Sequence, residues 1–150
     1  AREDARMVIA GYMVTNDVSI RDWQLRTSTA TLGKSFDTHG PIGPWITTAD
    51  EVPDPEALGI RTFVDGELRQ NGNTSELVNR IDDMIPYLTT VMTLEPGDIL
   101  LTGTPRGVAA GNTPPNWLRA GQVVRIEIDG LGHLENPVIA EPIAQTRLIA

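Results

Sequence analysis

The 150-residue sequence predicts a single, mainly β domain of the α+β class, with one or two helices. Several short runs alternate apolar and polar residues, which is typical of half-buried strands. The 14 glycines and 11 prolines are spread along the whole chain and indicate many turns between short elements. Only one long stretch carries apolar residues at intervals of three and four, the spacing of an amphipathic helix.

Two hairpins stand out among the expected strands. The dipeptides Asp65-Gly66 and Asp129-Gly130 favour positive φ angles and therefore predict tight turns between paired strands. The second arm of the first hairpin is polar, so we place it at a sheet edge. An apolar run at residues 99–102 predicts a short buried strand. The expected strands cover residues 8–15, 45–48, 60–64, 67–70, 99–102, 122–128 and 131–138.

Two helices are expected, one short and one long. The short helix covers residues 18–26, and the preceding Asn16-Asp17 pair is expected to cap the corner between strand and helix. The long helix begins at residue 74 or 75, continues to residue 91, and belongs to the core over residues 77–91. Pro86 lies within it and predicts a kink or a break. Residues 33–44 are expected to form a shaped loop.

The composition excludes several classes of function. Twelve basic and twenty acidic residues give a net charge of −8, and no basic stripe is present that could bind nucleic acid or a membrane surface. There is no cysteine, so a metal would be bound by oxygen or histidine, which favours Mg²⁺, Mn²⁺ or Ca²⁺. No signal-peptide pattern and no apolar run of about 18 residues occur. We therefore expect a cytoplasmic enzyme or binding domain.

The end of the first strand carries the best candidate for a metal ligand. Asp17 stands there, and Arg21 and Gln24 follow at helical spacing, so all three side chains could face one pocket. A carboxylate at a strand end is well placed to bind a hard cation. The alternative is that Asp17 only caps the helix. Arg21 could bind a substrate carboxylate, or it could form a surface ion pair with Asp17 or Asp22.

Two further positions could contact a substrate. Lys34 lies in the glycine-containing loop and could stabilise an enolate or polarise a carbonyl group, although loop lysines are commonly solvated. Thr104 follows the expected strand at 99–102 and offers a hydroxyl group to an anion, although Gly103-Thr104-Pro105 could equally be an ordinary turn.

Other patterns are weaker. Glu127 and Asp129 could form a carboxylate pair for a metal, but a hairpin turn explains Asp129. His39 and His133 have no second ligand at zinc-binding spacing. No serine-hydrolase or nucleotide-binding motif of the common types is present.

Taken together, five blocks resemble the fumarylacetoacetate hydrolase family over residues 9–138. In chain order they are GYMVTNDVSIRDWQ, LGKSFDTHGPIGPW, VDGELRQNGNTSELV, LEPGDILLTGTPRGV and GQVVRIEIDGLGHLENPV. The resemblance implies a mixed β-sandwich roll, usually assembled as a homodimer. It also implies a Mg²⁺-dependent enzyme that hydrolyses C–C bonds in acylpyruvate-like or fumarylacetoacetate-like 2-oxo or 1,3-dicarbonyl acids. The alternative within the family is an isomerase or decarboxylase of 2-hydroxy-dienoic diacids from aromatic catabolism.

The resemblance also assigns roles to individual residues. Asp17 matches a metal ligand, and Arg21 and Gln24 match contacts to substrate. Lys34 matches a lysine beside the metal and the substrate oxygen. Two threonines have counterparts as well: Thr38 matches a position that joins a further metal site in some members, and Thr104 matches a substrate contact.

One departure from the family pattern limits these expectations. The family binds its metal with an E-x-E pair on an earlier strand and activates water with a Glu–His pair on an earlier lid, and residues 1–10 reproduce neither. We therefore expect residues 1–150 to form a partial domain that lacks the N-terminal lid and the E-x-E strand. The chain is then a C-terminal fragment, or the missing part was lost, removed or supplied by a separate chain. A non-catalytic remnant is the competing interpretation.

Overall fold

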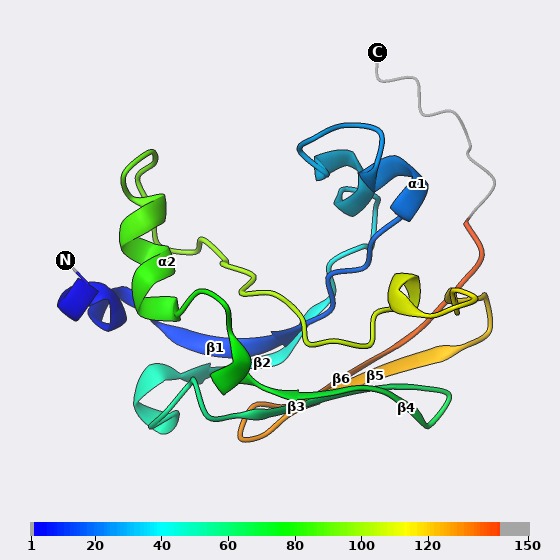
Figure 1. Ribbon diagram of the computed structural model, residues 1–150. Coiled ribbons are helices and arrows are strands. Elements are labelled where there is room, and N and C mark those ends of the chain that lie inside the picture. Colours follow the sequence, from blue (N-terminus) through cyan, green and yellow to red (C-terminus); the bar gives the residue numbers. More distant parts are fainter. Residues whose placement is uncertain (1, 142–150) are drawn as a thin grey trace, which may run out of the picture.

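The structure, a computed structural model, describes residues 2–141 as two antiparallel sheets with few helices (Figure 1). It confirms the predicted mainly β class. The smaller sheet pairs β1 (Gly11–Thr15) with β2 (Ile42–Thr48). The larger sheet has the strand order β4-β3-β5-β6. Its strands are β3 (Gly59–Val64), β4 (Glu67–Asn73), β5 (Val123–Ile128) and β6 (Gly132–Pro137).

Two α-helices stand on the same side of the sheets, at opposite ends of the molecule in Figure 1: α1 (Arg21–Gln24) and α2 (Ile81–Leu88). No helix among residues 2–141 is long and apolar enough to cross a membrane. Five short 3₁₀ helices complete the helical elements of these residues, and they are η1 (Arg2–Val8), η2 (Thr31–Lys34), η3 (Ala49–Glu51), η4 (Thr74–Glu76) and η5 (Ala109–Gly111).

Both predicted hairpins form. The turn between β3 and β4 places Asp65 at φ 51° and Gly66 at φ 80°, and Gly130 between β5 and β6 has φ 77°. These positive angles are those that the Asp-Gly dipeptides favour. β4 is paired only with β3, so the polar arm lies at a sheet edge, as predicted.

The core lies between the two sheets and is small. Val14 of β1 is fully buried and packs with residues of the larger sheet, including Val64 of β3 and Val124 and Ile126 of β5. The alternation along β5 points these two side chains to one face, which confirms the predicted pattern. This packing of Val14 on the larger sheet holds the end of β1 in place, and the candidate metal ligand Asp17 follows that end.

The predicted long helix at residues 74–91 is wrong in extent and in burial. Residues 74–76 form η4, and α2 starts only at Ile81. Pro86 does not break α2, because the helix continues through it to Leu88. Ile81 is the only buried residue of α2, whereas Tyr87 and the flanking Val78 and Val91 are exposed. The apolar spacing indicated an amphipathic helix correctly, but the described residues cover only a small part of its apolar face.

Other boundaries also differ from expectation. The predicted strand at residues 99–102 is wrong: residues 99–101 are exposed, and the segment pairs with no strand among residues 2–141. The first strand begins at residue 11, since residues 2–8 form η1. The expected loop at 33–44 is shorter, since Lys34 ends η2 and β2 begins at Ile42.

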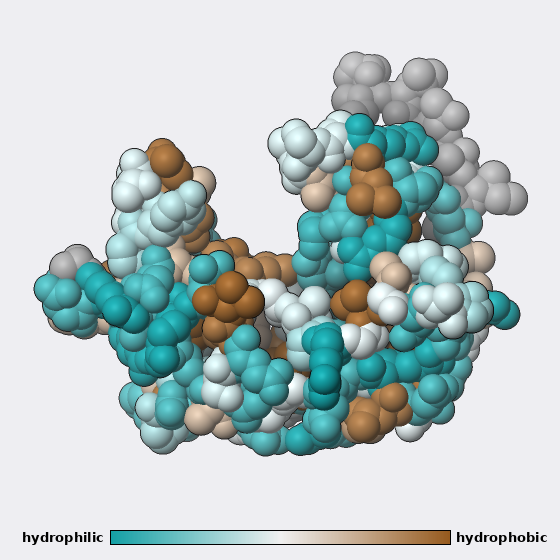
Figure 2. Space-filling view, viewed as in Figure 1, coloured by the Kyte–Doolittle hydropathy of each residue, from teal (hydrophilic) through white to brown (hydrophobic). Residues whose placement is uncertain are grey.

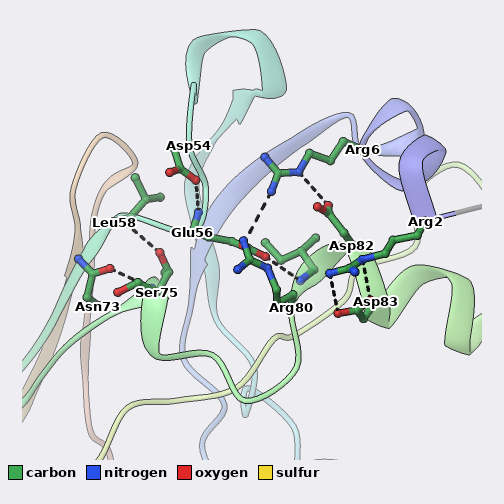
Figure 3. A network of polar contacts seen from close by, with 12 residues as sticks. Arg2, Arg6, Asp54, Glu56, Leu58, Asn73, Ser75, Arg80, Asp82 and Asp83 are labelled. Carbon is green, nitrogen blue, oxygen red and sulfur yellow. Dashed lines mark hydrogen bonds and ion pairs between the residues drawn. The ribbon is translucent and has the colours of Figure 1, made fainter.

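A polar cluster anchors α2 to the segment before β3 (Figure 3). The carboxylate of Glu56, whose side chain is only 6% exposed, forms an ion pair with Arg80 and accepts a 3.1 Å hydrogen bond from the backbone N–H of Ile81. Arg6 of η1 lies 3.8 Å from the same carboxylate and donates a 2.8 Å hydrogen bond to Asp82. Glu56 thus satisfies an amide at the start of the helix that has no partner within it.

Candidate functional site

Asp17 and Lys34 form the centre of the site. Asp17 lies in the segment between β1 and α1, Lys34 ends η2, and the lysine ammonium group forms an ion pair with Oδ2 of the aspartate. Each side chain is 38% exposed, so a ligand can reach both. The N-cap of α1 is Ile20, without a side-chain hydrogen bond. Helix capping, the alternative role of Asp17, and the predicted Asn16-Asp17 cap are therefore wrong.

Backbone contacts hold these two segments together. The N–H of Ile20 donates a 2.8 Å hydrogen bond to the carbonyl of Gly33, one residue before the lysine. A Cβ atom at Gly33 would lie 2.6 Å from the backbone nitrogen of Gln24, so only glycine permits this approach. At the other end of the loop, the N–H of Asn16 donates a 3.0 Å hydrogen bond to the carbonyl of Pro41. Asp17 and Lys34, seventeen residues apart in the sequence, meet because of this framework.

Arg21 and Gln24 form a second pair on α1. Nη1 of Arg21 donates a hydrogen bond of 2.5 Å to Oε1 of Gln24. The alternative ion pair of Arg21 is absent from the described residues, because Asp22 pairs with Arg26 at 3.5 Å and Asp17 pairs with Lys34. The guanidinium group has five N–H donors, and this contact uses one, so further donors can bind a substrate oxygen.

An aromatic row that the sequence analysis did not identify packs the loop against α1. The rings of Trp23 and Phe36 meet edge to face with centroids 5.8 Å apart, and the ring of His39 lies 5.5 Å from that of Phe36. Arg26 covers Trp23 at 3.8 Å. Nδ1 of His39 is buried and has no hydrogen-bond partner among residues 2–141. The only signal in the sequence was the presence of aromatic residues in an otherwise polar stretch.

Thr38 lies in the same loop as Lys34 but apart from the ion pair. No hydrogen bond within the described part of the chain joins it to Asp17 or Lys34, and its side chain is exposed. Its φ of 68° is in the left-handed region, which is uncommon for a β-branched residue. Backbone conformations of this kind cost on the order of 1–3 kcal/mol and are concentrated at functional sites.

Thr104 belongs to a different cluster. Its hydroxyl accepts a 2.9 Å hydrogen bond from Nε2 of Gln70 on β4, and the same amide donates at 2.7 Å to the carbonyl of Pro105. Within residues 2–141 no polar contact links Thr104 to Asp17 or Lys34. The structure therefore brings four of the six predicted site residues together in two adjacent pairs, and it places Thr38 and Thr104 separately.

Glu127 and Asp129, the weaker candidate for a metal-binding carboxylate pair, form ion pairs with arginines. Arg61 contacts Asp129 at 2.7 Å and Glu127 at 3.6 Å, and Arg125 donates a 2.7 Å hydrogen bond to Glu127. The hydrogen bond from Arg61 lowers the pKa of Asp129 below its ordinary value, and that from Arg125 does the same for the pKa of Glu127. These contacts agree with the interpretation of Asp129 as part of a hairpin turn.

The donor atoms near Asp17 fit a hard divalent cation only in part. A carboxylate is an appropriate ligand for Mg²⁺ or Mn²⁺, and Oδ1 stays available while Oδ2 contacts Lys34. However, residues 2–141 contain no group of three His, Cys, Asp or Glu side chains that could hold a metal ion. These residues can therefore supply one protein ligand, and a complete site needs oxygen atoms from elsewhere.

A family model described as fumarylacetoacetate (FAA) hydrolase C-terminal matches residues 1–139. The chain belongs to the fumarylacetoacetate hydrolase family. A protein from Burkholderia cenocepacia, named as a hydrolase, is 55% identical over 126 residues, which are 83% of this chain and 45% of that protein. The chain thus spans about half the length of the curated fumarylacetoacetate hydrolase family relatives that it matches.

Solved structures of the family are similar in fold. The maleylpyruvate hydrolase of Sphingobium sp. SYK-6, in complex with manganese(II) and pyruvate, is 42% identical with a TM-score of 0.81 over 93% of this chain and 47% of that one. The fumarylacetoacetate hydrolase of Exiguobacterium antarcticum is 39% identical with a TM-score of 0.86 (94% and 50%). A 2-hydroxyhepta-2,4-diene-1,7-dioate isomerase from Mycobacterium marinum is 39% identical with a TM-score of 0.82 (93% and 51%). These likenesses confirm the predicted fold, and they include both hydrolases and isomerases.

Proposed function

We propose that the protein is a divalent-metal-dependent hydrolase of C–C bonds in acylpyruvate-like or fumarylacetoacetate-like 2-oxo or 1,3-dicarbonyl acids. The observation that carries the proposal is the contact between Asp17 and Lys34 beside the Arg21–Gln24 pair. A carboxylate, an ammonium and a guanidinium group are held there by α1, η2 and the loop between them. Such a set suits a small anionic substrate with a polarised carbonyl group.

Each residue has a distinct task in this proposal. The Nζ–H groups of Lys34 donate to the substrate oxygen that gains negative charge during C–C cleavage. Arg21 binds the substrate carboxylate through its remaining N–H donors, and Gln24 orients the guanidinium group by its hydrogen bond. Thr104 offers its hydroxyl to the substrate from the separate cluster on β4.

Asp17 is the proposed metal ligand of this chain, and Thr38 is the proposed contact of a further metal ion. When bound, Mg²⁺ or Mn²⁺ would supply positive charge that polarises the substrate's oxygen atoms. The manganese complex of the Sphingobium maleylpyruvate hydrolase supports a divalent cation. We propose that the other protein ligands come from outside these 150 residues or from a second chain. The mass of the intact gene product tests this part of the proposal.

An isomerase of 2-hydroxy-dienoic diacids is the second candidate, because the Mycobacterium marinum relative is named for that activity. The two activities separate when the protein, as its gene encodes it, is assayed with Mg²⁺ or Mn²⁺ on an acylpyruvate and on 2-hydroxyhepta-2,4-dienedioate. We expect C–C hydrolysis of the acylpyruvate. Isomerisation of the dienedioate without hydrolysis would favour the second candidate, and bound metal with neither activity would favour a non-catalytic remnant.

The role of Asp17 has its own test. We expect Asp17→Asn to weaken binding of Mn²⁺ and to lower metal-dependent activity by about 100-fold or more, because a neutral amide is a poor ligand for a hard cation. The unfolding temperature should be nearly unchanged, since Asp17 caps no helix and its ion pair with Lys34 is exposed. Unaltered Mn²⁺ binding in this variant would refute the assignment. Asp37→Asn, at an exposed aspartate in the loop between η2 and β2, is the matched control.

Lys34 is the only lysine of the chain, which makes its role measurable. We expect Lys34→Met to lower kcat by about 100-fold with a smaller change in KM, because its hydrogen bond to the reacting oxygen strengthens as charge develops. Steady-state kinetics check this expectation. A raised KM with an unchanged kcat in Lys34→Met would instead indicate a role in substrate binding alone.

Assembly and location complete the proposal. We propose a homodimer in the cytoplasm that acts on a small-molecule 2-oxo acid and does not bind nucleic acid or membranes. Exposed apolar side chains on and beside α2, including Tyr87 and Val91, favour association. Light scattering at micromolar concentration measures the oligomeric state, and a monomer would contradict the dimer.

A further inference from the structure

The carboxylate of Asp17 has one counter-ion, the ammonium group of Lys34, which contacts Oδ2. No other ion pair or hydrogen bond reaches this carboxylate from the remainder of residues 2–141. Arg21 and Arg26, on and just after α1, contact other residues of their own segment. Within the described part of the chain, the negative charge of Asp17 is therefore balanced by Lys34 alone.

The contact between these two side chains can be exchanged at little cost to the fold. Lysine carries a compact charge on a flexible four-carbon stem, whereas Glu127 is held by the guanidinium groups of Arg61 and Arg125 at the same time. The Asp17 and Lys34 side chains are each 38% exposed, so ions and small ligands reach them. Ion pairs of this exposure contribute little to stability. The ammonium group can therefore leave the carboxylate without a large loss of stability.

The backbone beneath the pair is held by contacts that involve neither charge. The N–H of Ile20 donates to the carbonyl of Gly33 at 2.8 Å, one residue before the lysine. The N–H of Asn16 donates to the carbonyl of Pro41 at 3.0 Å, one residue before the aspartate. The side chain of Lys34 has no second hydrogen bond or ion pair among residues 2–141. Its charged end can thus move while the backbone on both sides keeps its place.

A divalent cation at Asp17 would share this carboxylate with the ammonium group. Even a cation on Oδ1 lies only one carboxylate away from the ammonium group on Oδ2, and the two positive charges repel each other over this short separation. The repulsion opposes metal binding for as long as Lys34 stays on the carboxylate. In the proposed function the ammonium group also has a second acceptor, the substrate oxygen that gains negative charge. Lys34 therefore has two possible partners, and only one of them leaves Asp17 to the cation.

We propose that Lys34 competes with the divalent cation for Asp17 and turns from this carboxylate to a substrate oxygen when the cation binds. The inference rests on the proposed function and adds a regulation of metal binding at the same site. It gives the charge of Lys34 two opposite effects. Removal of the charge strengthens metal binding, although the same change lowers kcat. A lysine that only supports the fold, or only holds the substrate, would not strengthen metal binding when it is replaced.

Binding of Mn²⁺ without substrate tests the competition in the protein as its gene encodes it, and the electron paramagnetic resonance signal of free Mn²⁺ measures it. We expect Lys34→Met and Lys34→Gln to bind Mn²⁺ about 5-fold more tightly than the native protein, the effect of one exposed ion pair. Lys34→Arg keeps the charge and should bind like the native protein. Arg119→Gln removes an equal charge from an exposed position elsewhere and should leave the affinity unchanged.

A double variant shows whether the effect passes through Asp17. When Asp17→Asn is already present, the further change Lys34→Met should not strengthen Mn²⁺ binding, because the ammonium group has no carboxylate left to compete for. An equal gain in both backgrounds would mean that Lys34 acts by general charge repulsion, and the competition would be overturned. Unfolding temperatures of all variants show that the fold is retained.

The same measurements separate failure of this inference from failure of the proposed function. Tighter Mn²⁺ binding in the two neutral Lys34 variants would support the competition even if the native protein turned over no substrate. Mn²⁺-dependent hydrolysis by the native protein, together with unchanged or weaker Mn²⁺ binding in these variants, would overturn the competition and leave the proposed function standing. Absence of Mn²⁺ binding in the native protein and in both neutral variants would overturn the competition and the metal dependence together.

Discussion

Two glycines permit close backbone crossings beside charged residues. At Gly33 a Cβ atom would lie 2.6 Å from the backbone of Gln24, and at Gly107 it would lie 2.3 Å from the carbonyl oxygen of Arg69. Distances below 3.0 Å to backbone require the backbone to move. Each glycine therefore permits a close crossing, and a charged residue, Lys34 or Arg106, stands next to it in the sequence.

Gly107→Ala tests this role by stability. The φ of 106° at Gly107 is unfavourable for any L-residue with a Cβ atom, and the clash adds to that cost. We expect the free energy of unfolding to fall by about 1–3 kcal/mol, measured by urea denaturation. Gly111→Ala is the control, because its Cβ atom would meet nothing within 4 Å and its φ is not positive. Equal stabilities of the two variants would show that the crossing adapts without cost.

Tyr12 gives a second prediction at the residue scale. Burial raises the pKa of its hydroxyl above the ordinary 10.0, and the nearby Arg6 only partly opposes this shift. A raised pKa in the folded state adds stability that is fully present below pH 10 and is lost as the pH rises through the folded pKa. We expect the unfolding temperature of the native protein to fall more steeply above pH 10 than that of Tyr12→Phe. Tyr87→Phe, at an exposed tyrosine, should retain the native slope.

At the scale of elements, local signals were sufficient for the hairpins and insufficient for the helix. Both arms of a hairpin are adjacent in sequence, so the Asp-Gly turns and the alternation predicted the pairing of β3 with β4 and of β5 with β6. The register shift between Thr62 and Phe63 in the β3–β4 pair was not predicted. The apolar spacing of residues 77–91 predicted a core helix, but burial depends on which other element covers a face. Spacing alone does not contain that information. The same reason explains why the predicted strand at residues 99–102 is wrong, because this apolar run pairs with no strand in the described part of the chain.

Glu56 holds α2, and its removal should loosen that element. We expect Glu56→Ala to lower the free energy of unfolding by about 1–3 kcal/mol, because the backbone N–H of Ile81 loses its acceptor at a buried position. Hydrogen exchange at the Ile81 amide should accelerate as well. Asp83→Asn is the control on the same helix: its pair with Arg2 is exposed, and its loss should change stability by less than about 1 kcal/mol. Unchanged exchange at Ile81 in Glu56→Ala would contradict the anchoring role.

At the scale of the whole molecule, the candidate site depends on contacts between distant residues, which the spacing of residues in the sequence does not predict. The family blocks pointed to Asp17 and Lys34 together, although seventeen residues separate them. The aromatic row at Trp23 and the contact of Thr104 with Gln70 arise only from the folded arrangement. Figure 2 shows a broad notch between the parts of the surface that carry α1 and α2, with hydrophobic residues at its floor. The core of the described residues is correspondingly small.

Three carboxylates that pair with arginines determine how the stability of the fold depends on pH in the acid range. Hydrogen bonds from Arg6, Arg125 and Arg61 hold the pKa values of Asp82, Glu127 and Asp129 below their ordinary values of 3.8, 4.5 and 3.8. A lowered pKa in the folded state adds stability that is present above the unfolded pKa and is lost as the pH falls through the folded pKa.

We therefore expect the unfolding temperature to be level between pH 7 and about 5 and to fall progressively below about pH 4.5. Because the side chains of these ion pairs are at least partly exposed to solvent, 1 M salt should flatten the decrease by screening them. Asp129→Asn removes one of the titrating groups. The unfolding temperature of this variant should therefore depend less on pH below about 4.5 than that of the native protein. Asp65→Asn, at the other hairpin turn, is the comparison variant. An unfolding temperature that stays constant to pH 3 would mean that the arginine contacts do not stabilise the folded state.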